Sequence, residues 1–568
     1  MSNQLIMSKY EQWLNSPKVS SRDKSLLATY SEEEIADAFY RDVEFGTAGL
    51  RGILGPGTNR VNYFTIRKAA VAFALALLDK FPDAKTRGVA IAHDNRHMSR
   101  ELTLDTAETF NRMGINTYIF NSLRPTPVLS YAVRYSNCVG GVMITASHNP
   151  KNYNGFKVYD ETGCQLVPDK LAPILAYNAN LPEYLELEIK DAPVRGINTI
   201  YDDAIDDAYL ADVKSIQINP NLAKEDFKIV YSPEHGASYY LAMKLAKELG
   251  YNVYPVESQV SPDPDFSGTL SPNPEDPKAY IEAIKLANEV HADVILITDP
   301  DADRVGVAYL DADGTYHLLT GNVSGTLLLD YVLGQRQKRG LLNELSTVYS
   351  TIVTSSFAET VTHSYGVKYA KFLTGFKFIG EAIEKANINH SGKFEFGFEE
   401  SYGCLISDFV RDKDAIQALV LYAEMANYYR LEGKTLGDAY EELQVKHGYQ
   451  NDISYAISFP GPTGDLKMKE IMYKLRSAPL RKVLDKEVIC YEDYLSSVAV
   501  CKDGTKEITL PTSDVLAIHL ADKETIIVRP SGTEPKIKFY YGVSNKDKKY
   551  TQQRPRLLHD EMKRLLNI

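Results

Sequence analysis

One stretch of the chain decides the fold: Val139-Gly140-Gly141-Val142-Met143-Ile144 runs directly into Thr145-Ala146-Ser147-His148-Asn149-Pro150. The first part has the length and apolar composition of a buried strand, and the second part is typical of a polar loop. Parallel α/β sheets carry their chemistry just beyond the carboxyl ends of strands. Ser147 is therefore a candidate nucleophile. A capped turn is the alternative, because Ser, Asn and Pro also favour turns.

The same pattern recurs along the chain. Apolar runs end at loops rich in functional residue types at 88–92, 227–231, 292–297 and 393–398. Helical patterns lie between these runs, for example over 239–249 and 278–290. Such alternation of strands and helices predicts parallel α/β sheets with right-handed crossovers.

A chain of 568 residues corresponds to about four domains. We expect a helical N-terminal extension over 1–40, α/β units over 41–217, 218–320 and 321–451, and an α+β unit over 452–568. The last unit differs because its apolar runs are shorter and the segment 501–505 reads as a hairpin.

Composition restricts the class of partner. The formal net charge of -12 argues against non-specific binding to nucleic acid or membranes, but it leaves an anionic small molecule open. Five scattered cysteines without a C-x-x-C pair fit a reducing compartment rather than a disulfide framework. The chain shows no apolar signal core and no stretch near the ~20 apolar residues of a membrane span. These features predict a cytoplasmic protein.

A metal site is indicated by the loop Asp299-Pro300-Asp301-Ala302-Asp303-Arg304. Its carboxylates stand at i, i+2 and i+4 after a buried strand, where their mutual repulsion demands a cation. An EF-hand calcium loop is excluded, because Arg304 stands where that loop requires glycine and Leu310 stands where it requires glutamate. Oxygen ligands in an intracellular chain favour Mg²⁺. A solvated acidic turn is the alternative.

An anion site is indicated near the C-terminus. The segment Arg529-Pro530-Ser531-Gly532-Thr533-Glu534 follows a strand-like run over 525–528. Arginine offers a planar fork to phosphate, and the hydroxyls and a glycine backbone add donors. Lys538 on the next strand adds charge. A common Ser-Gly turn between two strands is the alternative.

Three further segments carry weaker signals. Gly397-Phe398-Glu399-Glu400-Ser401-Tyr402-Gly403 brings carboxylates and a hydroxyl to a strand end, which suits sugar hydroxyls. Glycines surround Arg51 in the segment 44–52 and permit close approach of a ligand. The segment lacks the terminal Lys-Ser/Thr of a P-loop and a helix-opening Gly-x-Gly-x-x-Gly, so nucleotide binding is disfavoured. The run 411–414 is most simply a solvated charge run, although its Lys413 could reach a phosphate or donate a proton.

Five ordered motifs carry a resemblance that covers nearly the whole chain: G-T-A-G-L-R-G, T-A-S-H-N-P, D-P-D-A-D-R, G-F-E-E-S-Y-G and R-P-S-G-T-E. The chain resembles the α-D-phosphohexomutase superfamily, and most closely its longer phosphoglucomutase and phosphopentomutase branch. The resemblance implies four domains around a central cleft, the first three α/β with mixed, mostly parallel sheets and the fourth α+β. It also implies that Ser147 carries a phosphoryl group.

Roles for individual residues follow from the resemblance alone. Mg²⁺ would be held by Asp299, Asp301, Asp303 and a phosphoserine oxygen of Ser147. The residues near the transferring phosphoryl group would be Arg51, Lys157 and Arg304, with His148 as an orienter of the serine or as a cap. The substrate would be bound by Thr374, Gly375, Glu399, Ser401 and Lys413, and its non-reacting phosphate by Arg529, Ser531, Gly532 and Thr533.

The implied activity is interconversion of glucose 1-phosphate and glucose 6-phosphate through phospho-Ser147, with glucose 1,6-bisphosphate as intermediate and activator. Mutases that prefer mannose or pentose phosphates, a non-catalytic sugar-phosphate binder and a metal-dependent serine phosphatase are the alternatives. The expected partner is a small sugar phosphate, and the sequence leaves the oligomeric state open.

Overall fold

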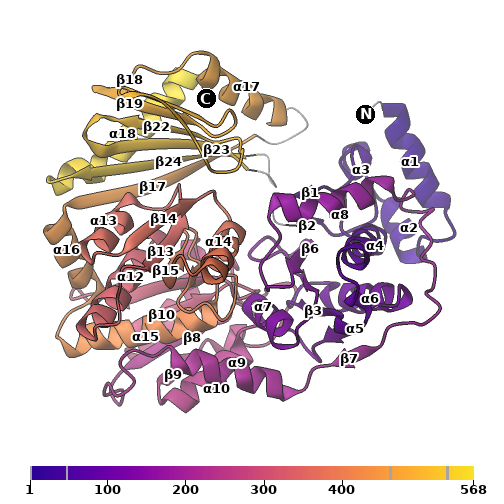
Figure 1. The fold of residues 1–568 in the computed structure, drawn as a ribbon, viewed down its shortest axis with the longest axis horizontal. Helices are drawn as coiled ribbons and strands as arrows, with labels where there is room; N and C mark the ends of the chain where they lie inside the picture. The colour runs from indigo at the N-terminus through magenta and orange to yellow at the C-terminus, as the bar shows by residue number, and fades with distance from the viewer. Residues whose placement is uncertain (1–2, 47–48, 460–463, 532–535) are drawn as a thin grey trace. The chain divides into compact units, whose positions relative to one another are not determined.

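The computed structural model describes residues 3–46, 49–459, 464–531 and 536–568 (Figure 1). The chain forms two compact units. The first comprises Met1–Gly321 and Phe376–Leu431, and the second comprises Asn322–Gly375 and Glu432–Ile568.

The first unit begins with three helices, as the sequence predicts. They are α1 (Asn3–Asn15), α2 (Ser21–Leu27) and α3 (Glu32–Phe39). Ser31 caps α3 and Glu34 bonds back to the cap, so both orphan N–H groups are satisfied. Trp13 and Phe39 are buried where these helices pack together.

A seven-stranded sheet follows, in the order β1-β2-β6-β5-β3-β4-β7. Its strands are β1 (Phe45–Gly46), β2 (Gly49–Ile53), β3 (Val89–His93), β4 (Thr117–Ile119), β5 (Gly140–Ile144), β6 (Tyr153–Asp160) and β7 (Asn198–Ile200). Strands β5, β3, β4 and β7 are parallel, whereas β6 and β2 run antiparallel to their neighbours. Strand β1 is also antiparallel to β2, so three pairings are parallel and three are antiparallel, and the sheet is mixed rather than mostly parallel.

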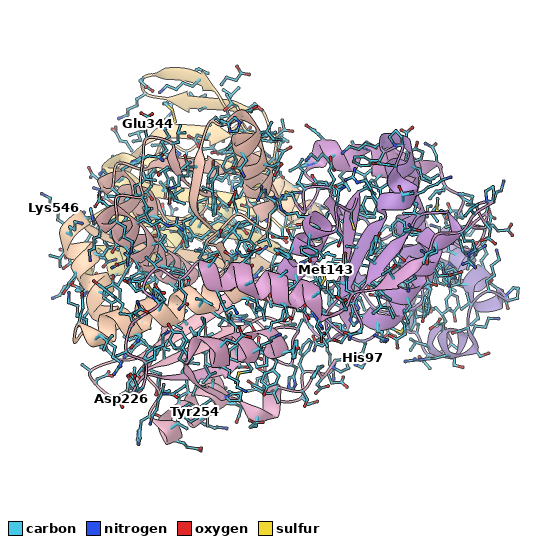
Figure 2. All side chains as sticks on the ribbon, turned by 60° about the horizontal axis from the view of Figure 1, so that its bottom comes forward. His97, Met143, Asp226, Tyr254, Glu344 and Lys546 are labelled. Carbon is cyan, nitrogen blue, oxygen red and sulfur yellow. A yellow bond between two sulfur atoms is a disulfide. The ribbon has the colours of Figure 1, made fainter. Side chains whose placement is uncertain are left out.

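Helices supply the apolar surface that this sheet needs. They are α4 (Tyr63–Lys80), α5 (Ala84–Arg87), α6 (Ser99–Arg112), α7 (Thr126–Tyr135) and α8 (Pro168–Asn180). Phe73 of α4 and Phe110 of α6 pack edge to face in one core with Ile91 and Val142 of the central strands. Met143 on β5 is also fully buried (Figure 2). A strand buried on both faces is what its continuous apolar sequence predicts.

The second sheet of the first unit has the order β12-β11-β10-β8-β9. Its strands are β8 (Lys228–Ser232), β9 (Asn252–Pro255), β10 (Val294–Thr298), β11 (Val305–Leu310) and β12 (Tyr316–Leu319), and its helices are α9 (Asp203–Ser215), α10 (Tyr239–Leu249) and α11 (Ile281–Val290). Strands β9, β8 and β10 are parallel. Strand β11 returns antiparallel to β10, so residues 299–304 form a tight hairpin loop.

The remainder of the first unit contains α14 (Phe376–Asn389), α15 (Ala415–Leu431) and the antiparallel pair β15 (Lys393–Phe398) and β16 (Cys404–Leu405). Helix α15 is buried along most of its length. Across the described ranges of the chain, no helix is both long enough and apolar enough to cross a membrane.

The second unit combines a parallel strand pair with an antiparallel sheet. The parallel pair is β13 (Ser346–Thr351) and β14 (Lys368–Phe372), accompanied by α12 (Gly321–Lys338), α13 (Ser356–Ser364) and α16 (Leu436–His447). The antiparallel sheet has the order β17-β24-β23-β22-β19-β20-β21.

The strands of this sheet are β17 (Tyr449–Ser458), β18 (Lys482–Val483, beside β19), β19 (Lys486–Asp493), β20 (Val498–Cys501), β21 (Gly504–Glu507), β22 (Leu516–Leu520), β23 (Glu524–Pro530) and β24 (Lys536–Asn545). Helices α17 (Gly464–Ser477) and α18 (Lys548–Leu566) cover it. Met472 and Met562 of these helices share a core with Val528 and Phe539 of the strands. Helices on one antiparallel sheet confirm the predicted α+β class.

The cysteines depart from the sequence expectation of a chain without disulfides. Cys490 on β19 and Cys501 on β20 are directly opposite in the strand register and form a disulfide. Cys138, Cys164 and Cys404 are free and buried. The spacing of the cysteines along the sequence did not predict this disulfide, because the pairing depends on the register of two hairpin strands. The hairpin over 501–505 is confirmed as the turn between β20 and β21.

Candidate active site

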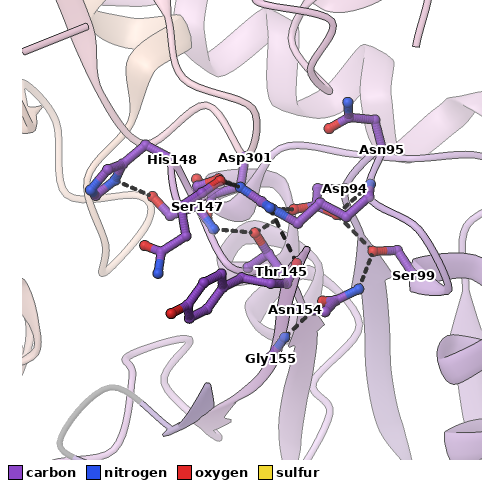
Figure 3. A network of polar contacts seen from close by, with 12 residues as sticks. Asp94, Asn95, Ser99, Thr145, Ser147, His148, Asn154, Gly155 and Asp301 are labelled. Carbon is purple, nitrogen blue, oxygen red and sulfur yellow. Dashed lines mark hydrogen bonds and ion pairs between the residues drawn. The ribbon is translucent and has the colours of Figure 1, made fainter. Parts of the chain in front are cut away.

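Ser147 lies just beyond the carboxyl end of β5, in the loop that the sequence predicts. Its backbone has a φ of 50° and its side chain is almost fully buried. The Ser147 N–H donates to Thr145 Oγ1 at 2.8 Å, and Thr145 Oγ1 donates to Asp94 Oδ2 at 2.6 Å (Figure 3). Asp94 also accepts from Ser99 Oγ at 2.7 Å. A polar network from two neighbouring strand ends therefore holds the serine in a left-handed conformation that a non-glycine residue rarely adopts.

Arg96 clamps the same loop. Its guanidinium donates to the carbonyls of Ser147 at 2.5 Å, Pro150 at 2.8 Å and Tyr153 at 3.2 Å, and also to that of Asn149. The side chain is fully buried and pairs with the Asp94 carboxylate at 3.3 Å. Sequence reasoning placed Arg96 beyond a strand but assigned it no role. The sequence could have pointed to Arg96, because its loop follows a strand as the serine loop does, and loops at the carboxyl ends of neighbouring strands lie close together.

Three buried carboxylates gather in the loop between β10 and β11. One oxygen each of Asp299, Asp301 and Asp303 lies within 4.8 Å of the others. Asp301 Oδ1 and Asp303 Oδ1 are buried and lack a hydrogen-bond partner among the described residues. Asp299 Oδ1 accepts the backbone N–H of Asp303 at 3.1 Å, which turns the loop back on itself. Buried carboxylate oxygens that converge without hydrogen-bond donors in this way fit a divalent cation.

The serine and the carboxylates form one site. Ser147 Oγ donates to Asp299 Oδ2 at 2.9 Å. Thr126 at the start of α7 donates to Asp301 twice, through Oγ1 to Oδ2 at 3.0 Å and through its N–H to the carbonyl at 2.8 Å. Residues from two sheets of the first unit thus meet, as expected for loops at the carboxyl ends of strands.

Two ammonium groups flank the carboxylates. Lys157 Nζ on β6 lies 2.8 Å from Asp301 Oδ2 and 3.8 Å from Asp303 Oδ2. Lys413 Nζ lies 3.1 Å from Asp303 Oδ2. Both lysines are largely buried, so the attraction is weakly screened. The site therefore holds two positive charges against its acidic centre.

These contacts shift the pKa values of Asp299 and Asp301 in opposite directions. Burial, together with repulsion by Asp301 and Asp303, raises the pKa of Asp299 well above its ordinary value. Burial alone would also raise the pKa of Asp301, but the Lys157 ammonium, a hydrogen bond with Asp299 and the Lys413 ammonium together lower that pKa. A cluster whose members resist ionising together is one that a bound cation stabilises.

His148 contacts the serine as a neutral imidazole. Its Nδ1 lies 3.1 Å from Ser147 Oγ (Figure 3). Burial, reinforced by the guanidinium groups of Arg304 and Arg51, lowers the pKa of His148 well below its ordinary value. Because the serine hydroxyl donates to Asp299, the contact requires the tautomer with hydrogen on Nδ1.

The two predicted arginines each contact a residue beside this centre. Arg51 on β2 donates from Nη1 to Asn149 Oδ1 of the serine loop at 3.3 Å. Arg304 forms an ion pair with Glu275 and is the immediate neighbour of the metal-loop carboxylate Asp303. Both positions lie in the first unit beside the predicted centre.

The run 411–414 corrects a sequence interpretation. It is not a solvated charge run, since Arg411 and Asp412 are 2% exposed and Asp414 is fully buried. Arg411 pairs with Glu384 at 2.8 Å, which offsets the cost of its burial. Partners from distant segments decide this burial, so the charge pattern alone misled. Lys413 reaches the acidic centre, as noted above.

Other sequence-predicted residues are divided between the two units. Glu399 and Ser401 follow β15 in the first unit, and Glu399 is almost fully buried. In the second unit, Thr374 and Gly375 follow β14, and Thr374 Oγ1 is buried without a hydrogen-bond partner among the described residues.

The predicted anion loop lies at the β23–β24 hairpin of the second unit. Arg529 and Lys538 are directly opposite in the register, and the Ser531 N–H donates to the Lys536 carbonyl at 2.8 Å. Gly532 and Thr533 lie outside the described residues.

Comparison with protein families gives matches along most of the chain. The descriptions are Phosphoglucomutase/phosphomannomutase alpha/beta/alpha domain I at residues 42–184, domain II at 207–312, domain III at 320–446, and C-terminal domain at 478–558. Four consecutive domains of one family, with Ser147 and the three aspartates in the first two, leave no ambiguity of class. The chain belongs to the phosphoglucomutase/phosphomannomutase family.

Individual relatives agree with this class. A protein of Staphylococcus aureus (strain bovine RF122 / ET3-1) named phosphoglucomutase is 38% identical over 516 residues, which are 89% of this chain and 90% of the relative. A Staphylococcus epidermidis protein of the same name is 36% identical over 531 residues, covering 92% and 95%. The superfamily resemblance of the sequence is thereby confirmed.

Solved structures share the fold. A phosphoglucomutase/phosphomannomutase family protein from Burkholderia thailandensis has a TM-score of 0.67 at 18% identity, covering 92% of this chain and 96% of that chain. The open form of the Paramecium exocytosis-sensitive phosphoprotein parafusin has a TM-score of 0.66 at 18% identity, covering 93% and 95%.

Proposed function

We propose that this protein is a phosphoglucomutase that interconverts glucose 1-phosphate and glucose 6-phosphate. The observation that carries the proposal is the 2.9 Å contact between Ser147 Oγ and Asp299 Oδ2, which sets a nucleophilic hydroxyl against a buried carboxylate cluster. Relatives that carry the name phosphoglucomutase at 38% and 36% identity support the choice of substrate.

The proposed reaction consists of two phosphoryl transfers, and each moves a different phosphoryl group. Phospho-Ser147 gives its phosphoryl group to the 6-hydroxyl of glucose 1-phosphate, so the bond from Oγ to phosphorus breaks and a bond from O6 to phosphorus forms. The resulting glucose 1,6-bisphosphate reorients, and Ser147 accepts the phosphoryl group from O1. The proton lost by the 6-hydroxyl is matched by the proton gained at O1. Glucose 6-phosphate leaves, and the phosphoserine is restored.

Asp299, Asp301, Asp303 and a phosphoserine oxygen would hold Mg²⁺, which neutralises charge on the phosphoryl oxygens when it is bound. The orphaned oxygens of Asp301 and Asp303 support this ligand set. Lys157, Arg304 and Arg51 would supply further positive charge or shuttle a proton, since phosphoryl transfer depends on positioning and charge neutralisation. Neutral His148 would orient the Ser147 hydroxyl through its 3.1 Å contact.

Loops other than the Ser147 loop and the carboxylate loop 299–304 would recognise the substrate. Glu399 and Ser401 would bind sugar hydroxyls, with Thr374 and Gly375 as a further sugar loop. Arg529, Ser531, Gly532, Thr533 and Lys538 would hold the phosphate that is not reacting, because a planar guanidinium fork fits phosphate oxygens. Lys413 would bind the substrate from the acidic centre. We also propose domain boundaries near residues 217, 320 and 451 and a cytoplasmic location.

A substrate panel tests the proposal. The full chain, with Mg²⁺ and glucose 1,6-bisphosphate, is assayed on the 1-phosphates of glucose, mannose, ribose and N-acetylglucosamine, with inorganic phosphate measured in parallel. Glucose 1-phosphate should give the highest kcat/KM with hardly any phosphate release. Higher kcat/KM on mannose or ribose 1-phosphate would reassign the substrate, stoichiometric phosphate release would indicate a phosphatase, and tight binding without turnover would indicate a binding protein.

A further inference from the structure

Lys413 is held at the acidic centre by two carboxylates. Its Nζ lies 3.1 Å from Asp303 Oδ2 and 3.3 Å from Asp412 Oδ1. Its aliphatic stem crosses Gly403, where a Cβ would lie 2.1 Å from Lys413 Cδ and 2.9 Å from Cγ. The absence of a side chain at Gly403 therefore leaves the space that the lysine stem occupies.

Asp412 is held in turn by Tyr159, a residue of β6 that lies far away in the sequence. Tyr159 Oη donates to Asp412 Oδ2 at 2.9 Å. Asp412 Oδ1 accepts the backbone N–H of Lys413 at 2.8 Å in addition to the ammonium contact. One carboxylate oxygen thus faces the tyrosine, and the other faces the lysine. Tyr159 is fully buried and Asp412 is 2% exposed, so water does not replace either contact.

Strand β6 therefore reaches the acidic centre by two routes. Lys157 and Tyr159 are two residues apart on this strand, so their side chains leave the same face of the sheet. Lys157 contacts Asp301 directly, whereas Tyr159 acts through Asp412 and Lys413 on Asp303. Burial and the Asp412 carboxylate raise the pKa of Tyr159 well above its ordinary value, so the hydroxyl keeps the proton that it donates.

We propose that Tyr159 and Asp412 are positioning residues that fix the Lys413 ammonium for substrate binding. The proposal rests on the proposed function, in which Lys413 contacts the sugar phosphate. A lysine ammonium on a four-carbon stem has many rotamers, and ordering them in advance spares that entropy when the substrate binds. Loss of the Tyr159 hydroxyl should therefore weaken substrate binding more than it slows phosphoryl transfer.

The chain offers a matched control in a second buried tyrosine–aspartate pair. Tyr209 Oη donates to Asp414 at 2.8 Å to Oδ1 and 2.9 Å to Oδ2. Asp414 accepts the N–H groups of Ile416 and Gln417, so it caps the start of α15. Like Tyr159→Phe, Tyr209→Phe removes a tyrosine hydroxyl that donates to a buried carboxylate. That carboxylate belongs to Asp414, two residues after Asp412. The variant reports the structural cost of such a loss without the link to Lys413.

The experiment measures KM and kcat for glucose 1-phosphate in Tyr159→Phe, Asp412→Asn and Tyr209→Phe, each alone and combined with Lys413→Ala. We expect Tyr159→Phe and Asp412→Asn to raise KM about tenfold, the scale of a lost hydrogen bond to a charged group, with a smaller change in kcat. In the Lys413→Ala background neither should raise KM further. Tyr209→Phe should lower the thermal midpoint of unfolding by about as much as Tyr159→Phe does, but its KM should stay within about twofold of the wild-type value.

Equal KM values for Tyr159→Phe and Tyr209→Phe would overturn the proposal, as would effects that multiply with Lys413→Ala. If the wild-type chain interconverts no sugar phosphate, the proposed function fails, and the positioning role is then tested by crystal structures. The wild type should keep Lys413 Nζ within hydrogen-bond distance of Asp303, and Tyr159→Phe should not. An unchanged lysine in that variant would refute the positioning role independently of activity.

Discussion

Ser147 Oγ and Asp299 Oδ2 lie 2.9 Å apart although 152 positions separate them in the chain. The contact exists because β5 and β10 both end at the same site, and Thr126 ties the start of α7 to the metal loop through Asp301. The hydrogen bond to the carboxylate fixes the direction of the serine hydroxyl, as the proposed phosphoryl transfer requires. Asp299 also belongs to the carboxylate cluster that is proposed to bind Mg²⁺.

Ser147→Ala should abolish mutase turnover, because it removes the atom that would carry the phosphoryl group. Assays with glucose 1-phosphate, Mg²⁺ and the bisphosphate measure the loss, and mass spectrometry of the wild-type chain should place the phosphoryl group on Ser147. Ser25→Ala on α2 is the control, since its hydroxyl bonds only within that helix turn among the described contacts. Turnover at the wild-type rate in Ser147→Ala would disprove the mechanism.

Asp301→Asn should weaken Mg²⁺ binding by roughly 10- to 100-fold, since it removes one of three converging carboxylate charges. Calorimetric titration with Mg²⁺ measures the affinity, and the Mg²⁺ dependence of turnover should shift in parallel. A chelator should abolish wild-type turnover, and added Mg²⁺ should restore it. Asp226→Asn serves as control, because this acidic residue is exposed, lies just before β8 and belongs to neither carboxylate group that could hold a metal. Equal Mg²⁺ affinities of the two variants would contradict the metal assignment.

Arg96→Lys should lower kcat by about tenfold or more and reduce stability by about 1–3 kcal/mol, because one ammonium cannot serve the carbonyls that the guanidinium fork bonds. Steady-state kinetics and thermal unfolding measure the two effects. Arg124→Lys is the matched control: Arg124 is another buried arginine and pairs with Asp206 at 2.8 Å. It should lose similar stability while kcat stays within about twofold. A normal kcat in Arg96→Lys would show that the clamp serves stability alone.

The sequence predicts much of the fold because hydrophobic periodicity is a local signal. The expected helix over 239–249 is α10 itself, and the expected strand over 139–144 is β5 with one residue fewer. The loops that hold Ser147 and the three aspartates were likewise predictable, since each loop follows a buried strand, where α/β folds place their chemistry.

Properties that depend on distant partners were not predictable. The clamp of Arg96 on four carbonyls requires two loops to meet in space, and the sequence shows only the loops. Arg411 and Asp412 looked solvated because their partners Glu384 and Tyr159 belong to other segments. The Cys490–Cys501 disulfide depends on strand register. Burial and register are set by tertiary packing, which a charge or cysteine pattern does not encode.

Glu234 should make the stability of the protein fall as pH rises from about 5 to 8. Burial raises the pKa of this carboxyl from 4.5 to about 8, and the hydroxyls of Thr269 and Ser232 offset only part of the rise. Below pH 4.5 the carboxyl is protonated in both states. Between 4.5 and about 8 only the unfolded chain ionises, so unfolding releases a proton and each pH unit costs about 1.4 kcal/mol of stability. Above about 8 both states are ionised, and the effect levels off.

Glu234→Gln removes this titration while keeping a polar side chain of the same shape. The variant should gain stability relative to the wild type as pH rises from 5 to 8, because only the unfolded wild type ionises in this range. The difference should be largest near pH 8, where ionisation of the folded carboxyl makes it level off. Thermal midpoints at several pH values measure the difference between the two proteins. Glu188→Gln, at an exposed position, should follow the wild-type curve. A constant offset between Glu234→Gln and the wild type across this range would show that the Glu234 carboxyl is not protonated in the folded protein.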